Sequence, residues 1–249
     1  RPPRSTLFPY TTLFRSGLKD YNWRFFIMNT RERYARFHLI LCQRFPNAKL
    51  ELNYRNAFEL FVALLLSARC SDKLVNQRTY ELFTRFKTFQ EIVEADQSDI
   101  KRYLKDITFA DDKAVHLIKS AQIITERHNG EVPENVNMLL QLPGVGRKTA
   151  NLLLSELYNI PSIAVDTHVS RVSKRLGLTK RETELMVEKD LMNIIPKDEW
   201  VVSTRQFMLW GRYICKFNNP DCERCPANSL CETIHPISVL PDTPMLPFA

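Results

Sequence analysis

Apolar residues along this chain recur with the period of an α-helix in nearly every segment. Between residues 30 and 45 they follow three- and four-residue steps, and Pro46 then ends the pattern. Asn56, followed three residues later by Glu59, is typical of a capping box that opens an apolar helix reaching about Ala68. Because that helix is apolar on most sides, we expect it to lie in the middle of a core.

Further amphipathic stretches predict helices through the rest of the chain, with prolines between several of them. They are expected at about residues 72–86, 89–94, 98–106, 111–128, 135–141, 147–158, 167–176, 181–194 and 198–213. No run of six or more residues alternates in the manner of a strand built from Val, Ile and Thr, so no sheet is expected. The sequence therefore predicts an all-α fold.

The two ends of the chain fall outside this helical pattern. Residues 6–16 read TLFPYTTLFRS, which resembles a translated sequencing adapter, so we expect residues 1–27 to be non-native. A signal peptide is the alternative, although Pro9 and Arg15 interrupt its apolar core. The proline-rich tail 233–249 is expected to be disordered. The longest apolar run, 57–68, is too short to span a bilayer, so no membrane partner is expected.

The charge of the chain points only weakly to an anionic partner. The formal net charge is +7, but without the five basic residues and one acidic residue of the first 27 positions it falls to +3. Residues 169–181 contain five basic side chains and no acidic one. A run of this kind is usually a solvated surface, and it favours nucleic acid only together with other evidence.

A glycine-containing turn joins two predicted helices at Leu142-Pro-Gly-Val-Gly-Arg-Lys-Thr-Ala150. Because Gly144 and Gly146 carry no side chain, backbone N–H groups of this turn can approach an oxyanion closely. The helix that begins near Arg147 adds a partial positive charge at its start. The pattern favours a cradle for DNA phosphate. A plain corner between two helices is the alternative.

Four of the six cysteines lie within 17 residues near the C-terminal end, spaced Cys215-x6-Cys222-x2-Cys225-x5-Cys231. Disulfides are disfavoured because we do not expect residues 1–27 to be a secretory signal. Structural zinc usually takes two short Cys-x-x-Cys knuckles, and only one is present. Four cysteines within 17 residues are also unlikely to have clustered by chance. We expect the other two cysteines, Cys42 and Cys70, to be ordinary buried thiols.

Taken together, these motifs resemble the endonuclease III family of helix-hairpin-helix DNA glycosylases. The likeness covers residues 30–232 and is carried by His128-Asn-Gly-Glu-Val-Pro133, Lys148-Thr-Ala-Asn151, Ala164-Val-Asp-Thr-His-Val169 and Arg171-Val-Ser173. It implies a bifunctional DNA glycosylase and AP lyase of base excision repair that acts on oxidised pyrimidines. It also implies that Lys148 is the nucleophile and Asp166 the catalytic carboxylate. The four clustered cysteines, Cys215, Cys222, Cys225 and Cys231, are then the ligands of a [4Fe–4S] cluster.

The resemblance further implies two helical domains on either side of a DNA-binding groove. Residues 50–160 would form a six-helix barrel with the helix-hairpin-helix at about 138–152, and residues 28–49 with 161–232 would form the cluster domain. The implied partner is double-stranded DNA containing a damaged base or an abasic site. We expect a monomer in the cytoplasm of a prokaryotic cell, associated with the nucleoid.

Several positions depart from the family pattern at the expected DNA surface. Arg69 stands where the family commonly has a glutamine that fills the gap left by the flipped nucleotide, so the opposite-base preference is in doubt. Phe109 takes the position of an apolar wedge, whereas Asp111 and Asp112 add negative charge nearby. Trp210 stands where a histidine is frequent. The further DNA contacts that we expect are Gly144, Val145, Gly146, Arg147, His168 and Lys216.

The proposed chemistry explains why a lysine and an aspartate are needed. A carboxylate stabilises positive charge on the sugar as the glycosidic bond breaks. An amine that attacks C1′ leaves an imine, which lets the 3′ phosphate depart by β-elimination. The simpler alternatives are a surface lysine that binds phosphate and an aspartate that caps the helix beginning at Thr167.

Two other functions compete with the bifunctional enzyme. A monofunctional mismatch or adenine glycosylase of the same superfamily generally lacks the hairpin lysine, so Lys148 favours lyase activity. A non-enzymatic DNA-binding iron–sulfur protein is the second alternative, and it is disfavoured because Asp166 would then have no catalytic function.

Overall fold

The computed structural model describes residues 28–235, and every regular element in that range is helical. This confirms the all-α prediction. The elements are α1 (Thr30–Arg44), α2 (Ala57–Ser67), α3 (Asp72–Arg85), α4 (Phe89–Val93), α5 (Gln97–Tyr103), α6 (Ala110–His128), α7 (Val136–Leu139), α8 (Arg147–Tyr158), α9 (Thr167–Arg175), α10 (Glu184–Ile194), η2 (Lys197–Glu199), α11 (Trp200–Tyr213) and η3 (Asn228–Leu230). The expectations for residues 1–27, and for the tail from residue 236 onward, lie outside the described residues.

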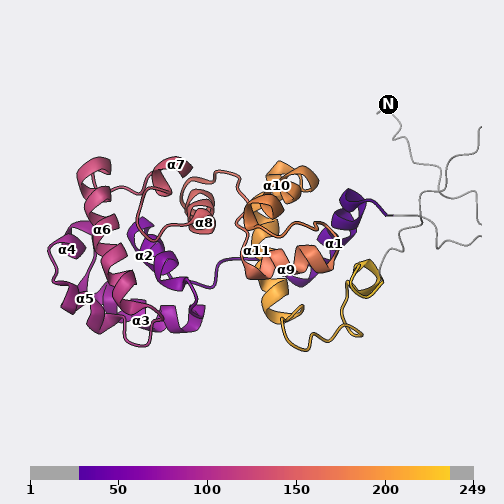
Figure 1. The fold of residues 1–249 in the computed structure, drawn as a ribbon, viewed down its shortest axis with the longest axis horizontal. Helices are drawn as coiled ribbons and strands as arrows, with labels where there is room; N and C mark the ends of the chain where they lie inside the picture. Colours follow the sequence, from indigo (N-terminus) through magenta and orange to yellow (C-terminus); the bar gives the residue numbers. More distant parts are fainter. Residues whose placement is uncertain (1–27, 236–249) are drawn as a thin grey trace, which may run out of the picture.

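The helices form two groups that lie side by side (Figure 1). One group contains α2 to α8. The other contains α9, α10 and α11, and α1 joins it from the other end of the chain by packing against α11. The chain therefore passes from the second group to the first and back again. The exact division into domains at residues 49/50 and 160/161 stays a prediction.

Helix α2 lies in the middle of the first group, as its apolar sequence predicts. Its residues are buried without interruption from Phe58 to Leu66. The Asn56 side chain caps the helix by accepting a hydrogen bond from the Glu59 N–H at 2.9 Å. Glu59 accepts from the backbone N–H of Arg55 at 2.8 Å, one residue before the position that a full capping box uses. Of the two hydrogen bonds in the predicted capping box, the structure therefore has the one that the Asn56 side chain accepts, while the Glu59 side chain bonds to Arg55 instead of Asn56.

Trp210 and the two isolated cysteines, Cys42 and Cys70, differ in how far they are buried. Trp210 is fully buried, with its ring edge-on to Phe37 at a centroid distance of 4.9 Å and to Phe45 at 6.5 Å. It therefore joins α11 to α1 as part of the core. The prediction that Cys42 and Cys70 are buried thiols is wrong, because Cys42 is exposed and Cys70 is only half-buried. The Cys42 Sγ atom lies 3.8 Å from Nε2 of the buried Gln206 of α11 and 3.2 Å from His38 Nε2.

No helix within residues 28–235 is both long enough and apolar enough to cross a membrane.

Gly177, after the end of α9, should not tolerate a side chain. Its φ is +73°, and a Cβ there would lie 1.7 Å from Glu232 Oε2 and 2.2 Å from Arg33 Nη1, which form an ion pair. We expect Gly177→Ala to lower the free energy of unfolding by about 1–3 kcal/mol, measured by urea titration. Gly130→Ala is the matched control, because Gly130 has a φ of +79° but open space around it. Equal losses in both variants would show that the ion pair contributes nothing.

Candidate active site

The glycine-containing turn is held in place by the long helix α6. Val145 N–H donates to Leu142 C=O at 3.0 Å, and Gly144, with a φ of +80°, takes the third position of the turn after Pro143, as in a type II turn. The Ser120 hydroxyl of α6 donates to Pro143 C=O at 2.8 Å. Gly144 and Gly146 are exposed, whereas the Val145 side chain is buried, so a DNA contact at Val145 would have to come from its backbone.

Lys148 lies in the first turn of α8, directly after this turn of the hairpin. The helix begins after Gly146, which offers no side chain to cap its free N–H groups. The start of α8 therefore presents a partial positive charge near Lys148 and near any phosphate bound by the hairpin. The Lys148 side chain is 37% exposed, so its amine is accessible to a ligand.

Asp166 caps helix α9 with one carboxylate oxygen and faces Lys148 with the other. Its Oδ1 accepts hydrogen bonds from the N–H groups of His168 and Val169, both at 2.8 Å. Its Oδ2 lies 3.8 Å from Lys148 Nζ. The predicted N-cap is thus confirmed, and it is compatible with catalysis because it leaves one oxygen free. The fold brings together two side chains that the sequence places on different helices.

Lys148 and Asp166 line one cavity between the two groups of helices, together with Ser67, Asp72 and Arg212. Burial raises the pKa of Asp72. The neighbouring Lys148 lowers that pKa, and the charge of Asp166 raises it further. Arg212 Nη1 lies 2.7 Å from Asp72 Oδ2. Sequence reasoning missed Asp72 and Arg212, since nothing near either residue in the sequence indicates that they meet.

Arg69 and Phe109, predicted as separate DNA contacts, lie against each other. The Arg69 guanidinium carbon is 5.6 Å from the centroid of the Phe109 ring. Both residues are exposed, and both have a positive φ, 56° for Arg69 and 59° for Phe109. The structure therefore unites two loops that are 40 residues apart in the sequence.

Two other predicted DNA contacts are engaged within the protein. Arg147 donates two hydrogen bonds to the buried carboxylate of Glu188, at 2.6 and 2.8 Å, and this bond raises the pKa of Arg147. His168 Nδ1 lies 3.1 Å from Arg171 Nη2. Lys216, by contrast, is exposed. DNA binding by these residues stays a prediction.

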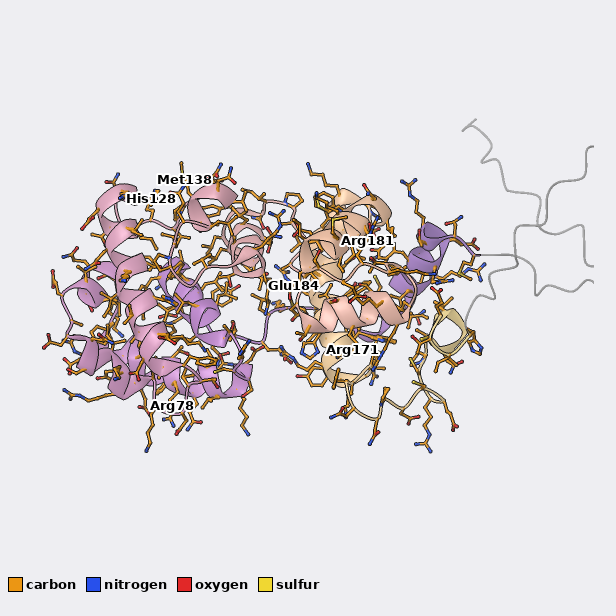
Figure 2. The ribbon with its side chains drawn as sticks, in the orientation of Figure 1. Arg78, His128, Met138, Arg171, Arg181 and Glu184 are labelled. Carbon is orange, nitrogen blue, oxygen red and sulfur yellow. The ribbon has the colours of Figure 1, made fainter. Side chains whose placement is uncertain are left out.

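Arg171 links α9 to the first clustered cysteine. Its guanidinium donates to Gly211 C=O at 2.7 Å and to Cys215 C=O at 3.0 Å. Figure 2 shows this side chain below α9, toward the end of α11. Gly211 is needed there because a Cβ at that position would lie 2.7 Å from His168 Cβ. Helices α9 and α11 therefore approach closely where the cysteine-containing segment begins.

The four clustered cysteines are all half-buried at the end of the second group of helices. Burial raises the pKa of Cys225, a hydrogen bond from the backbone N–H of Ala227 lowers it, and the charges of Cys215, Cys231 and Cys222 raise it. Arg175 Nη1 donates to Cys215 Sγ at 3.3 Å. Within residues 28–235, no three His, Cys, Asp or Glu side chains are arranged as metal ligands. The donor set nevertheless fits a group that takes four thiolates.

Comparison with known proteins connects this site to DNA repair. Residues 62–197 match the family model described as HhH-GPD superfamily base excision DNA repair protein. The chain is 44% identical to endonuclease III of Bacillus subtilis (strain 168) over 188 residues, which is 75% of this chain and 86% of the relative. It is 40% identical to endonuclease III of Escherichia coli (strain K12) over 187 residues, 75% of this chain and 89% of the relative.

Solved structures show the same similarity. A trapped endonuclease III–DNA covalent intermediate, described as an estranged-adenine complex, matches with a TM-score of 0.81 and 40% identity, over 84% of this chain and 98% of that one. A thermostable thymine-DNA glycosylase matches with a TM-score of 0.74 at 20% identity, over 83% of this chain and 98% of that one. At 20% identity, the match to the thymine-DNA glycosylase shows only that the two proteins share a fold.

Proposed function

This chain belongs to the endonuclease III family, within the HhH-GPD superfamily of base excision DNA repair proteins, and we propose that it excises oxidised pyrimidines from double-stranded DNA through an imine formed by Lys148. It is a bifunctional DNA glycosylase and AP lyase. The proposal concerns the residues that carry the reaction and the class of damaged base. Because its substrate is chromosomal DNA and its relatives are bacterial, we place it at the nucleoid of a prokaryotic cell.

The observation that carries this proposal is the pair formed by Lys148 and Asp166, whose Nζ and Oδ2 atoms lie 3.8 Å apart in one cavity. As the bond between the base and C1′ breaks, positive charge develops on the sugar, and the free oxygen of Asp166 stabilises it. The Lys148 amine attacks C1′, and the sugar ring opens to an imine. Loss of a C2′ proton then expels the 3′ phosphate by β-elimination, and water releases the lysine.

The hairpin supports this chemistry by holding the DNA backbone. The exposed Gly144 and Gly146 and the start of α8 offer N–H groups and a partial positive charge to a phosphate next to the damaged nucleotide. Such a contact does not depend on base sequence, which suits an enzyme that must find damage anywhere. The monofunctional alternative is disfavoured because Lys148 reaches into the cavity that contains Asp166. The non-enzymatic alternative gives this pair no role.

Borohydride trapping tests the proposed imine. We expect the protein to form a covalent complex with a duplex that contains one thymine glycol when sodium borohydride is present, because borohydride reduces an imine to a stable amine. Peptide mapping should place the DNA adduct on Lys148. An undamaged duplex of the same sequence is the control and should give no complex. Base release without a trapped complex would indicate that the protein is a monofunctional glycosylase and would contradict the proposed imine.

We further propose that Cys215, Cys222, Cys225 and Cys231 hold the [4Fe–4S] cluster. The family binds such a cluster, and this chain offers four half-buried thiols in one segment, with Arg175 in contact with Cys215 Sγ through its N–H and with Cys231 Sγ through its C=O. The bound cluster would supply structural order to the segment from Cys215 to Cys231. Lys216 directly follows the first ligand, so an ordered segment would fix its exposed amine for phosphate binding.

Replacing any one of the four proposed ligands by serine should remove most of the iron, because a hydroxyl binds iron much more weakly than a thiolate. Iron and acid-labile sulfide per chain measure this loss after anaerobic purification. Cys42→Ser and Cys70→Ser are matched controls and should keep the full iron content. A variant of one proposed ligand that retains all its iron would remove that cysteine from the ligand set.

A further inference from the structure

A thiol, an imidazole and a carboxylate form a chain of contacts outside the catalytic cavity. Tyr34, His38 and Cys42 are four residues apart, so their side chains share one face of α1. Cys42 Sγ lies 3.2 Å from His38 Nε2, and His38 Nδ1 lies 3.7 Å from Glu199 Oε2. Cys42 is exposed, whereas His38 is half-buried. None of these four residues lines the cavity that contains Lys148.

The hydrogen bonds of Tyr34 assign the protons of the imidazole. The Tyr34 hydroxyl donates its one proton to Glu199 Oε2 at 2.6 Å. Burial raises the pKa of Tyr34, the bond to Glu199 raises it further, and the bond with Ser203 lowers it by less, so the phenol keeps this proton. His38 Nδ1 lies 3.1 Å from the same oxygen and is therefore the donor in that contact. In the neutral imidazole this leaves Nε2 as an acceptor, and Nε2 is the atom that faces the Cys42 thiol.

This arrangement prepares the thiol for nucleophilic attack. His38 Nε2 can take the thiol proton, and the Glu199 carboxylate beside Nδ1 stabilises the imidazolium that results. The thiolate, and not the thiol, is the form that attacks disulfides. An exposed cysteine without such neighbours would have neither a base nor a group that orients the base. Cys42 has both.

A buried amide on α11 adjoins the same sulfur. Gln206 is 1% exposed, and its Nε2 lies 3.8 Å from Cys42 Sγ and donates to Phe45 C=O at 3.2 Å. In the described part of the chain, its Oε1 is buried without a hydrogen-bond partner. An unpaired buried oxygen is unfavourable, and a group attached to Sγ that carries amide N–H donors would offer it a partner. This favours an adduct with a small peptide thiol over one with an apolar thiol.

We propose that Cys42 is a thiol-modification site, activated by His38, that exchanges with the disulfides of low-molecular-weight peptide thiols. The Cys42 thiolate attacks one sulfur of the small disulfide, so a new S–S bond forms and the original S–S bond breaks. The departing thiolate takes up the proton that His38 Nε2 received. Cys42 is thereby oxidised, and the leaving thiol is reduced. The adduct lies where α1 packs against α11, and the inference does not depend on the proposed function.

Treatment of the anaerobically purified protein with oxidised glutathione tests this proposal. Every sample carries Cys70→Ser, so that Cys42 is the one cysteine outside the clustered four. Mass spectrometry of the acid-quenched protein gives the rate of adduct formation, and peptide mapping locates the adduct. We expect one glutathione per chain, attached to Cys42. A further Cys42→Ser substitution should prevent the adduct.

His38→Gln should slow formation of the adduct by about tenfold, because an amide does not take up the thiol proton. Glu199→Gln should slow it by a smaller factor, since it keeps an acceptor for the Tyr34 O–H but loses the charge beside Nδ1. His128→Gln is the matched control and should react at the normal rate, because His128 is a half-buried histidine at the end of α6.

A slower rate in His38→Gln identifies the loss of the base. A substitution that only loosened α1 would leave Cys42 at least as exposed and would not slow its reaction. Two results would overturn the inference. One is the absence of glutathione on Cys42, and the other is an equal rate of adduct formation in His38→Gln and in the chain that keeps His38.

Discussion

Lys148→Ala should eliminate the borohydride-trapped complex and slow cleavage at a preformed abasic site by about a thousandfold or more. The alanine variant has no amine to attack C1′, so no imine can form and the 3′ phosphate has no electron sink. Its folding should change little, because Lys148 is 37% exposed and its Nζ lies as far as 3.8 Å from Asp166 Oδ2. Single-turnover cleavage of an abasic duplex, monitored on a gel, measures the effect.

Two further variants separate nucleophilicity from charge. Lys148→Arg keeps a positive charge in the cavity but stays protonated, so it should also fail to form the trapped complex. Lys119→Ala removes an exposed lysine from α6 and should behave as the unmodified protein. A trapped complex that survives in Lys148→Ala would show that another amine is the nucleophile, and the proposed mechanism would then be wrong.

Asp166→Asn should slow base excision by about a hundredfold to a thousandfold while leaving cleavage at a preformed abasic site much less affected. Asparagine is as good an N-cap as aspartate, so its side-chain oxygen can still accept from the N–H groups of His168 and Val169. The substitution therefore removes the charge and keeps the cap. Release of thymine glycol in single-turnover assays measures the loss, and trapping on an abasic duplex shows the retained step.

The cap and the charge can be separated by comparing two variants at this position. Asp166→Ala removes both, and it should lower the free energy of unfolding by about 1 kcal/mol in addition to slowing excision. Asp166→Asn should leave the free energy of unfolding nearly unchanged. If Asp166→Asn excises the base at the normal rate, Asp166 is a helix cap and has no catalytic role.

The helices and the local parts of the site could be predicted from the sequence because they depend on residues close together in the chain. The three- and four-residue apolar steps follow from the helical repeat, and N-caps such as Asn56 and Asp166 act on N–H groups two or three residues ahead. Even so, the cap at Asn56 is only half of the predicted box, because the Glu59 carboxylate bonds one residue further back. Competing local geometries of this kind differ too little in energy for sequence patterns to separate them.

Only the tertiary structure decided which of the predicted residues meet and which are engaged elsewhere. Arg147 pairs with Glu188, which is 41 residues away, and Lys113 binds carbonyl groups more than 40 residues away. The contact between Arg69 and Phe109 exists because buried Lys113 draws two loops together. Such contacts depend on how whole helices pack, and no periodicity records them. The sequence by itself determined the helical fold, the hairpin and the four-cysteine segment, because those features are local. The tertiary structure decided the geometry of the cavity and of the contact between Arg69 and Phe109, since these depend on packing between distant segments.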